Sequence, residues 1–182
     1  MRDAVFYPLV LLAGAATIAI ALAWGEREPL SPADIARDGY GLRGDALAQL
    51  TASPGTEFIV TRHSGRAVQV ASREASPPSA GVFMTLPPAA EATFAERDIR
   101  VTWRLRRESG TGQVQLGYFT LGAGDSRWLT FDIDESWRDV EFRFRPGAAD
   151  GKGFDFAGLW PGVGEPDGAP VLVESVRVRL DD

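Results

Sequence analysis

Residues 98–121, DIRVTWRLRRESGTGQVQLGYFTL, decide the fold that this sequence predicts. In the first half of the stretch apolar and polar side chains alternate, as in a β-strand with one buried face. Four apolar side chains would share that face: Ile99, Val101, Trp103 and Leu105. The glycines and polar residues that follow are a turn signal, so we expect residues 98–121 to form a β-hairpin.

The same period of two recurs from Glu57 to the end of the chain. It is found in EFIVTRHSGRAVQVA (57–71), GVFMTL (81–86), SRWLTFDI (126–133), DVEFRFRP (139–146) and PVLVESVRVRL (170–180). The predicted inward side chains include Leu129, Phe131, Ile133, Val140, Phe142, Phe144, Val176, Val178 and Leu180. About eight or nine short strands with turn signals between them, and no long helix, predict an all-β, antiparallel β-sandwich.

Four pieces of the second half follow an order shared with a known family: IRVTWRLRR (99–107), WRDVEFRFRP (137–146), DFAGLWPG (155–162) and VLVESVRVRL (171–180). Residues 55–180 thereby resemble the galactose-binding-domain-like jelly rolls, which include many carbohydrate-binding modules. The resemblance implies a protein that binds sugars, lipids or proteins, or that braces a neighbouring domain. Many members hold a structural calcium, but no Asp-rich loop here corresponds to that site, so we expect no metal and no cofactor.

Composition excludes several classes of function. The 182 residues include no cysteine and a single histidine, which excludes disulfides, thiol catalysis and zinc sites built from Cys or several His. The net charge of −6 gives no attraction to nucleic acid. No phosphate loop, nucleophile elbow or cofactor fingerprint is present. We therefore predict a protein that is not an enzyme.

The N-terminal segment predicts a membrane anchor. Residues 4–24, AVFYPLVLLAGAATIAIALAW, carry no charge and are long enough to span the ~30 Å apolar core of a bilayer. Tyr7 and Trp24 lie near its ends, where aromatic side chains prefer the membrane interface. A cleaved signal peptide is the alternative, but the apolar run exceeds the roughly 7–15 residues of a signal-peptide core. We predict an uncleaved anchor over residues 1–25 in a bacterial inner membrane, with the N-terminus cytoplasmic and the C-terminal domain periplasmic.

Residues 26–55 predict a linker with short helices, which precedes a sandwich domain at 56–182. Ser31 and Pro32 are typical of a helix cap and first turn, and Gly39 ends that helix. Residues 45–50 predict a second short helix.

Three carboxylates lie close together in FDIDESWRDVEFRF (131–144): Asp132, Asp134 and Glu135. On a strand the two aspartates share a face, as in a metal site or an acid–base pair. Calcium needs about six to eight oxygens, however, and glycoside hydrolysis needs a defined separation across a cleft. We interpret these acids as a strand edge and turn, where charge opposes edge-to-edge pairing. His63 and Ser64 are likewise interpreted as part of a turn and not as a catalytic pair.

The tryptophans divide by position. Trp103 and Trp137 fit core positions, Trp128 falls on the face opposite Leu129, and Trp160 lies in a loop rich in Gly and Pro. An exposed tryptophan can stack on a sugar ring or anchor a protein interface. Trp128 and Trp160 are therefore candidate binding residues, and packing against the sandwich is the alternative for both.

Arginines recur on the predicted outward faces of three strands. The candidates are Arg100, Arg104, Arg106 and Arg143, with Arg177 and Arg179 on the last strand. In one sheet they would form a ladder able to bind anionic polysaccharide, lipid headgroups or an acidic partner. Cross-strand ion pairs, worth only ~0.2–1 kcal/mol each, are the alternative.

Two hypotheses for function follow. In the first, the protein is a non-catalytic accessory subunit that packs its helix and its sandwich against a larger integral membrane complex, because the small residues of AGAATIAIALA (13–23) permit close helix packing. In the second, it is a carbohydrate-binding module tethered to the cell envelope. The first is favoured, since a sugar binder usually shows a clearer row of aromatic residues on one face.

Overall fold

The computed structural model describes residues 30–61, 64–69, 81–120, 124–149, 154–162 and 169–181. The chain divides into two compact units, Met1–Ser31 and Pro32–Asp182, and the second contains the elements described below. The predicted anchor with Tyr7 and Trp24 lies outside the described residues, as does His63. Among the residues that are described, none belongs to a helix long and apolar enough to cross a membrane.

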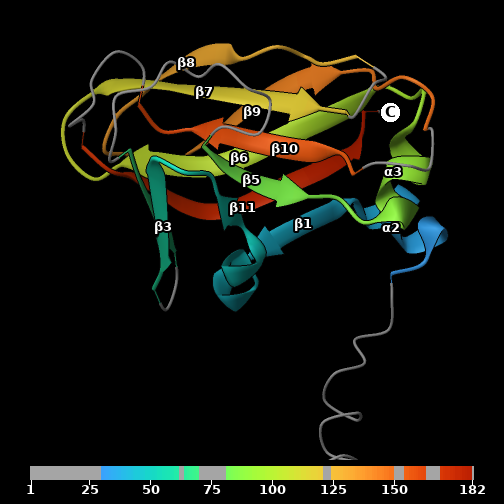
Figure 1. Cartoon of the computed structure of the whole chain (residues 1–182), viewed down its shortest axis with the longest axis horizontal. Helices are drawn as coiled ribbons and strands as arrows, with labels where there is room; N and C mark the ends of the chain where they lie inside the picture. Colours follow the sequence, from blue (N-terminus) through green and yellow to red (C-terminus); the bar gives the residue numbers. More distant parts are fainter. Residues whose placement is uncertain are drawn as a thin grey trace, which may run out of the picture. The chain divides into compact units, whose positions relative to one another are not determined.

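Two antiparallel sheets form the second unit (Figure 1). The six-stranded sheet has the order β3-β4-β11-β6-β9, with β1 also paired to β11, and the five-stranded sheet has the order β2-β5-β10-β7-β8. The strands are β1 (Tyr40–Arg43), β2 (Thr51–Ala52), β3 (Thr56–Val60), β4 (Gly65–Gln69), β5 (Val82–Thr85), β6 (Ile99–Arg107), β7 (Gly112–Phe119), β8 (Leu129–Ile133), β9 (Arg138–Phe144), β10 (Phe156–Trp160) and β11 (Val171–Leu180). The predicted all-β, antiparallel sandwich is confirmed.

The core lies between the two sheets and follows the predicted alternation. Every second residue of β6 is buried, and Trp103 is fully buried at its centre. The predicted inward side chains of β8, β9 and β11 are either buried or packed against this core. In β11 a β-bulge between Val173 and Ser175 shifts the alternation by one residue, so that Val176 still faces inward.

The chain crosses between the sheets at a point where a hairpin was predicted. Strand β6 pairs with β9 and β11, whereas β7 pairs with β8 and β10. Residues 98–121 are therefore not a hairpin, and that prediction was wrong. Strands β8 and β9 also lie in different sheets. The alternation identifies each strand and the side chains that face the core. It does not identify the neighbouring strand, because two consecutive strands can pair in one sheet or face one another across the core.

Residues 32–52, predicted to belong to a linker, are part of the sandwich. Helix α2 (Pro32–Asp38) and the 3-10 helix η1 (Gly44–Gln49) bury Ile35 and Leu47 completely. The strands of this segment, β1 and β2, pair with β11 and β5. The linker prediction over residues 26–55 is corrected because these apolar side chains complete the core, although the two predicted helix positions are right.

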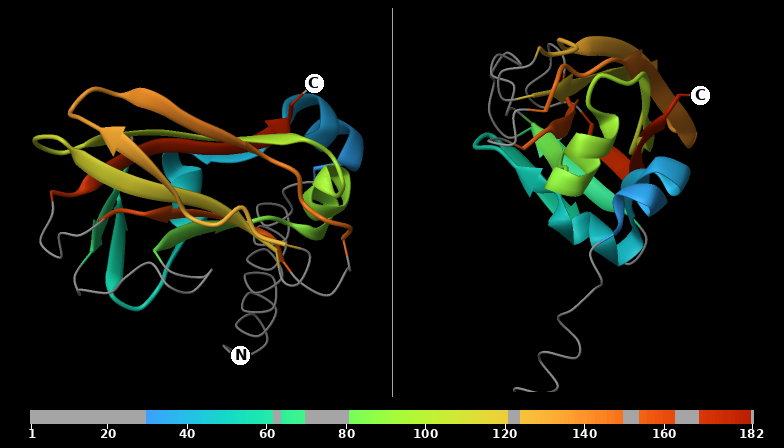
Figure 2. Two further views of the ribbon diagram at one scale, coloured as in Figure 1. Left: turned by 90° about the horizontal axis from the view of Figure 1, so that it is seen from above. Right: turned by 90° about the vertical axis from the view of Figure 1, so that its right-hand side faces the viewer.

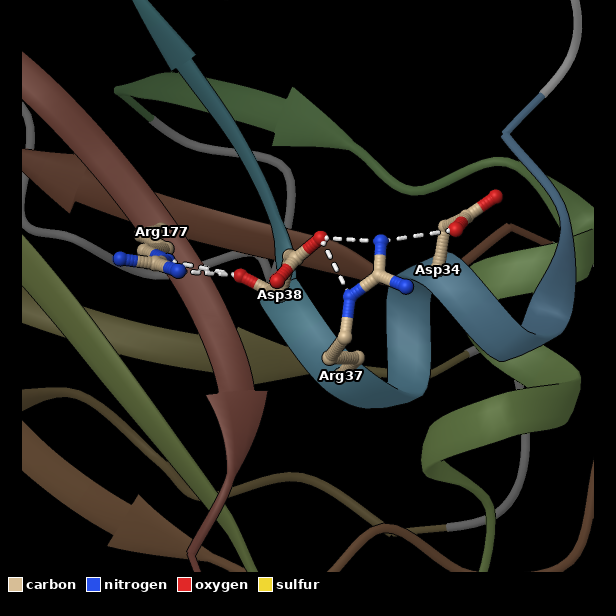
Figure 3. A network of polar contacts seen from close by, with 4 residues as sticks. All are labelled: Asp34, Arg37, Asp38 and Arg177. Atoms are coloured by element: carbon tan, nitrogen blue, oxygen red, sulfur yellow. Dashed lines mark hydrogen bonds and ion pairs between the residues drawn. The ribbon is translucent and has the colours of Figure 1, made fainter.

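Helices α2 and α3 (Pro88–Phe94) contact one another at one end of the sandwich (Figure 2). Helix α3 was not predicted, and it buries Ala90 and Phe94. Arg177 of β11 holds the end of α2, because its Nε donates to the Asp38 carbonyl oxygen at 3.1 Å (Figure 3). Arg37 forms ion pairs with Asp34 at 2.9 Å and with Asp38 at 2.8 Å. Together with the bond from Arg177, these contacts fix the last turn of α2 against the six-stranded sheet.

Candidate functional site

The outward side of the five-stranded sheet carries aromatic and uncharged polar side chains. The strand registers place these residues on it: Thr51, Phe83, Thr85, Gln113, Gln115, Gly117, Phe119, Thr130, Asp132, Phe156, Gly158 and Trp160, with Trp128 just before β8. We call this set the neutral face. At these described positions Asp132 is the only charged residue.

Aromatic side chains are concentrated at the centre of the neutral face. The rings of Phe119 and Trp128 lie 4.8 Å apart, and those of Phe83 and Phe156 meet edge to face at 5.4 Å. Phe119 is buried, whereas Phe83, Phe156 and Trp128 are half-buried. The three half-buried rings leave part of their surface open on the outward side of the sheet, where they could contact a ligand or a partner.

Two glycines leave the space that these rings occupy. Gly117 and Gly158 stand opposite one another on β7 and β10. A Cβ at Gly158 would lie 3.0 Å from Cη2 of Trp128 and 3.3 Å from Cε2 of Phe119. A Cβ at Gly117 would lie 2.5 Å from Cζ of Phe119. The glycines therefore allow the rings of Phe119 and Trp128 to lie low over the sheet.

Polar side chains continue the neutral face along β7 and β8. Gln115 donates from Nε2 to Oγ1 of Thr130 at 3.2 Å, and Gln113 donates from Nε2 to Oδ1 of Asp132 at 2.9 Å. These bonds orient the amides and leave each group with further hydrogen-bonding capacity. A strip of the face thus passes from an aromatic surface at Trp128 to hydrogen-bonding groups at Asp132.

The outward side of the six-stranded sheet is ionic. Arg100 pairs with Glu141 at 2.9 Å and with Asp181 at 2.6 Å. Arg143 shares Asp181 at 2.6 Å. Arg104 pairs with Asp139 at 3.3 Å and also with Glu174. The predicted arginines of β6 and β9 do lie in one sheet, and three of the four candidates form the cross-strand ion pairs of the alternative interpretation.

Arg106 has a different environment. Its guanidinium lies 5.2 Å from the ring centroid of Trp137, and its Nη1 donates to the backbone oxygens of Arg107 and Glu135, each at 3.3 Å. Trp137 is half-buried and lies outside the core cluster, so its prediction as a core residue was wrong. The planar guanidinium of Arg106 covers the Trp137 ring at the crossover between β8 and β9. This cation–π contact shields the ring, which does not pack in the core.

Asp181 supports a prediction for acid stability. The hydrogen bond from Arg100 holds the pKa of this carboxyl below its usual value. Because the folded pKa is depressed, the stabilisation is present above the unfolded pKa of about 4 and is lost as the pH falls through the folded value. We expect Asp181→Asn to unfold more easily than wild type at pH 7 and the difference to shrink below about pH 4. Urea unfolding at a series of pH values measures this, and a difference that stays constant down to pH 2 contradicts it.

The structure places the two candidate tryptophans on the same sheet face. Trp128 lies on the side opposite Leu129, as predicted. Trp160 is not in a loop: it is the last residue of β10 and only 4% exposed. Sequence reasoning missed Phe83, Phe119 and Phe156. The one available signal was the pair Tyr118-Phe119, since adjacent aromatic residues on a strand must point to opposite faces.

Tyr118 is the inward member of that pair. Its hydroxyl donates to Oδ2 of Asp155 at 2.5 Å, and both residues are buried. Burial raises the pKa of Tyr118. The neutral Tyr118 hydroxyl therefore stabilises the folded state fully below the usual tyrosine pKa of about 10. This stabilisation is lost at higher pH, where tyrosine ionises freely only in the unfolded chain.

Tyr118→Phe is expected to lower the free energy of unfolding by about 1–3 kcal/mol, because the buried carboxyl of Asp155 loses a hydrogen-bond donor. Urea unfolding at pH 7 tests this, and Tyr40→Phe is the matched control, since the half-buried Tyr40 forms no described side-chain hydrogen bond. Equal stability of the Tyr118→Phe variant and wild type contradicts the prediction.

The resemblance implies a structural calcium in many family members. In the described part of the chain no three side chains of the Asp, Glu, His or Cys type gather closely enough to hold a metal ion. Asp132 and Asp134 lie near one another, but Asp134 is already bonded to Arg138. We therefore derive no role for a metal.

Comparison with known proteins places this fold. No family model matches the sequence, and no curated protein matches it. Among solved structures, the CBM22-1 xylan-binding domain of Xyn10C from Paenibacillus barcinonensis matches with a TM-score of 0.55 at 14% identity, over 78% of this chain and 92% of that one. The second N-terminal cellulose-binding domain of β-1,4-glucanase C from Cellulomonas fimi matches with a TM-score of 0.53 at 9% identity, over 79% and 92%.

These matches show the fold of the chain. The chain has the jelly-roll β-sandwich of carbohydrate-binding modules, and the resemblance stated from the sequence is confirmed at the level of the fold.

Proposed function

We propose that this protein is a non-catalytic carbohydrate-binding domain whose neutral face binds a glycan. The observation that carries the proposal is the gathering of aromatic side chains on the outward side of one sheet, next to amides and hydroxyls. An aromatic ring packs against the C–H face of a sugar, and the neighbouring polar groups bond to its hydroxyls. The fold shared with a xylan-binding and a cellulose-binding domain supports the same conclusion.

The ligand that suits this face is a neutral polysaccharide chain. The described positions of the neutral face include no basic side chain, so an anionic polymer would find no cation there. Arg100, Arg104 and Arg143 lie on the other sheet, where acids already neutralise them. Chains of the xylan or β-glucan type are therefore the proposed ligands.

The predicted anchor would hold the domain at the periplasmic surface of a bacterial inner membrane, within reach of envelope polymers. That location stays a prediction from residues 4–24, which lie outside the described residues. The hypothesis of an accessory subunit in a membrane complex depends on the same segment. The glycan hypothesis has the additional support of the neutral face, and we favour it for that reason.

Calorimetric titration of the full chain in mild detergent tests the proposal. Soluble xylan and hydroxyethylcellulose are the neutral probes, and polygalacturonate is the anionic control. We expect a Kd of about 1 mM or tighter for at least one neutral polymer. No binding to either neutral polymer, or equal binding to polygalacturonate, would show that the neutral face has another role. Purification with a stoichiometric membrane partner would favour the subunit hypothesis.

A further inference from the structure

We propose that a hollow at the end of β8 is a second subsite, which receives one sugar residue of the same glycan, either a chain end or a side branch. This inference rests on the proposed function. The hollow has a volume of about 310 Å³ and is lined by Thr111, Gly112, Asp132, Ile133, Asp134 and Arg138. Ligand pockets in proteins range over roughly 300–1,000 Å³, so this one suits a single small ring.

The hollow continues the neutral face, because Asp132 belongs to both. Trp128, Thr130 and Asp132 follow one another on the outward side of β8, in steps of roughly 7 Å. The backbone spans roughly 14 Å from Trp128 to Asp132. The indole of Trp128 reaches across β7 to Gly158 of β10, so a glycan stacked on it would cross β7 on its way to the hollow. The geometry thus connects an aromatic platform to an open hollow near the end of one strand.

The charges around the hollow balance, which argues for an uncharged ligand. Arg138 is ion-paired with Asp134 inside the hollow. The guanidinium of Arg107 lies behind the wall of the hollow. It is so close to Gly112 that a Cβ added at Gly112 would lie 1.5 Å from Nη1 of Arg107. Arg107 is 6% exposed, and its Nε has no hydrogen-bond partner in the described structure. The two aspartates are thus offset by two arginines, and a cation would gain little here.

The hollow offers both donors and acceptors. Oδ1 of Asp132 accepts from Gln113 at 2.9 Å, and Oδ1 of Asp134 accepts from the Ser136 backbone N–H at 2.8 Å. Each carboxylate has further acceptor sites, and the guanidinium of Arg138 has donors beyond the one it gives to Asp134. Sugar hydroxyls both donate and accept, so this mixture can recognise the hydroxyl pattern of one residue.

Amide chemical shifts of the ¹⁵N-labelled full chain separate this inference from the proposed function. Gly112 and Asp134 report on the hollow, and Gln115 and Thr130 report on the neutral face. With xylohexaose or cellohexaose, whichever corresponds to the polymer bound in the titration, we expect shifts at both pairs. Shifts at the face alone would overturn the subsite and leave the proposed function standing. Shifts at the hollow alone would overturn the role of the face, and no shift at either pair would overturn both.

Two variants test whether the hollow contributes affinity. Asp132→Asn and Arg138→Gln are each expected to weaken xylohexaose binding about tenfold, while xylobiose, too short to reach from Trp128 to the hollow, changes less than twofold. Arg143→Gln on the ionic sheet is the matched control and should change neither. Because the Arg138 side chain is 43% exposed, Arg138→Gln should not unfold the domain. Circular dichroism of the variant checks that it is folded. Unchanged xylohexaose affinity in both variants overturns the inference.

Discussion

Replacing Trp128 with alanine is expected to weaken binding of a neutral oligosaccharide by roughly 30-fold, or about 2 kcal/mol, the loss typical of a hot-spot aromatic residue. The indole is half-buried over Gly158 and packs at 4.8 Å against Phe119, so it is held in one orientation before a ligand arrives. A preorganised ring loses little conformational entropy on binding. Calorimetric titration with xylohexaose measures the loss.

Two further variants control for that experiment. Trp128→Phe keeps a ring above the glycines and should retain most of the affinity. Trp137→Ala removes another half-buried tryptophan, which lies against Arg106 and is not a member of the neutral face, and should lose much less affinity than Trp128→Ala. Wild-type affinity in Trp128→Ala, or an equal loss in Trp137→Ala, would contradict the assignment of the neutral face.

Trp103→Ala is expected to lower the free energy of unfolding by about 3–5 kcal/mol, as is usual when a large aromatic side chain is removed from a core. Trp103 is fully buried on β6, the strand that pairs with both β9 and β11 in the six-stranded sheet. The cavity would lie at the centre of the sandwich, where neighbours can collapse only partly. Such a loss is a large share of the about 5–15 kcal/mol that stabilises a typical domain.

Urea unfolding followed by circular dichroism measures this effect as a lower midpoint. Trp103→Phe should lose clearly less, because a ring still fills most of the space and the indole Nε1 forms no hydrogen bond with the described residues. Trp137→Ala serves again as the control and should cost less than Trp103→Ala, since Trp137 lies outside the core. A midpoint for Trp103→Ala close to that of wild type would show that this position is not central to the core.

The candidate site could be predicted only in part. Trp128 was found because the strand pattern put it opposite Leu129. Phe83 was missed because a strand pattern assigns each residue to one of two sides but does not say which side meets the core. Phe156 was missed because no strand was predicted around it. Trp160 was taken for a loop residue because Gly and Pro follow it, yet pairing of β10 with β5 and β7 makes it the end of a strand. The ion pairs of Arg100 and Arg104 required knowing which strands are neighbours.

The sequence by itself determined the all-β class, the limits of most strands and the inward side chains of β6, β8, β9 and β11. Those properties depend on the alternation of side chains along a single strand, which is local. Only the tertiary structure decided that β6 and β7 belong to different sheets, that residues 32–52 complete the sandwich, and that aromatic residues from separate strands meet on one face. Each of these depends on pairing between residues far apart in the chain, and many pairings satisfy the same local pattern.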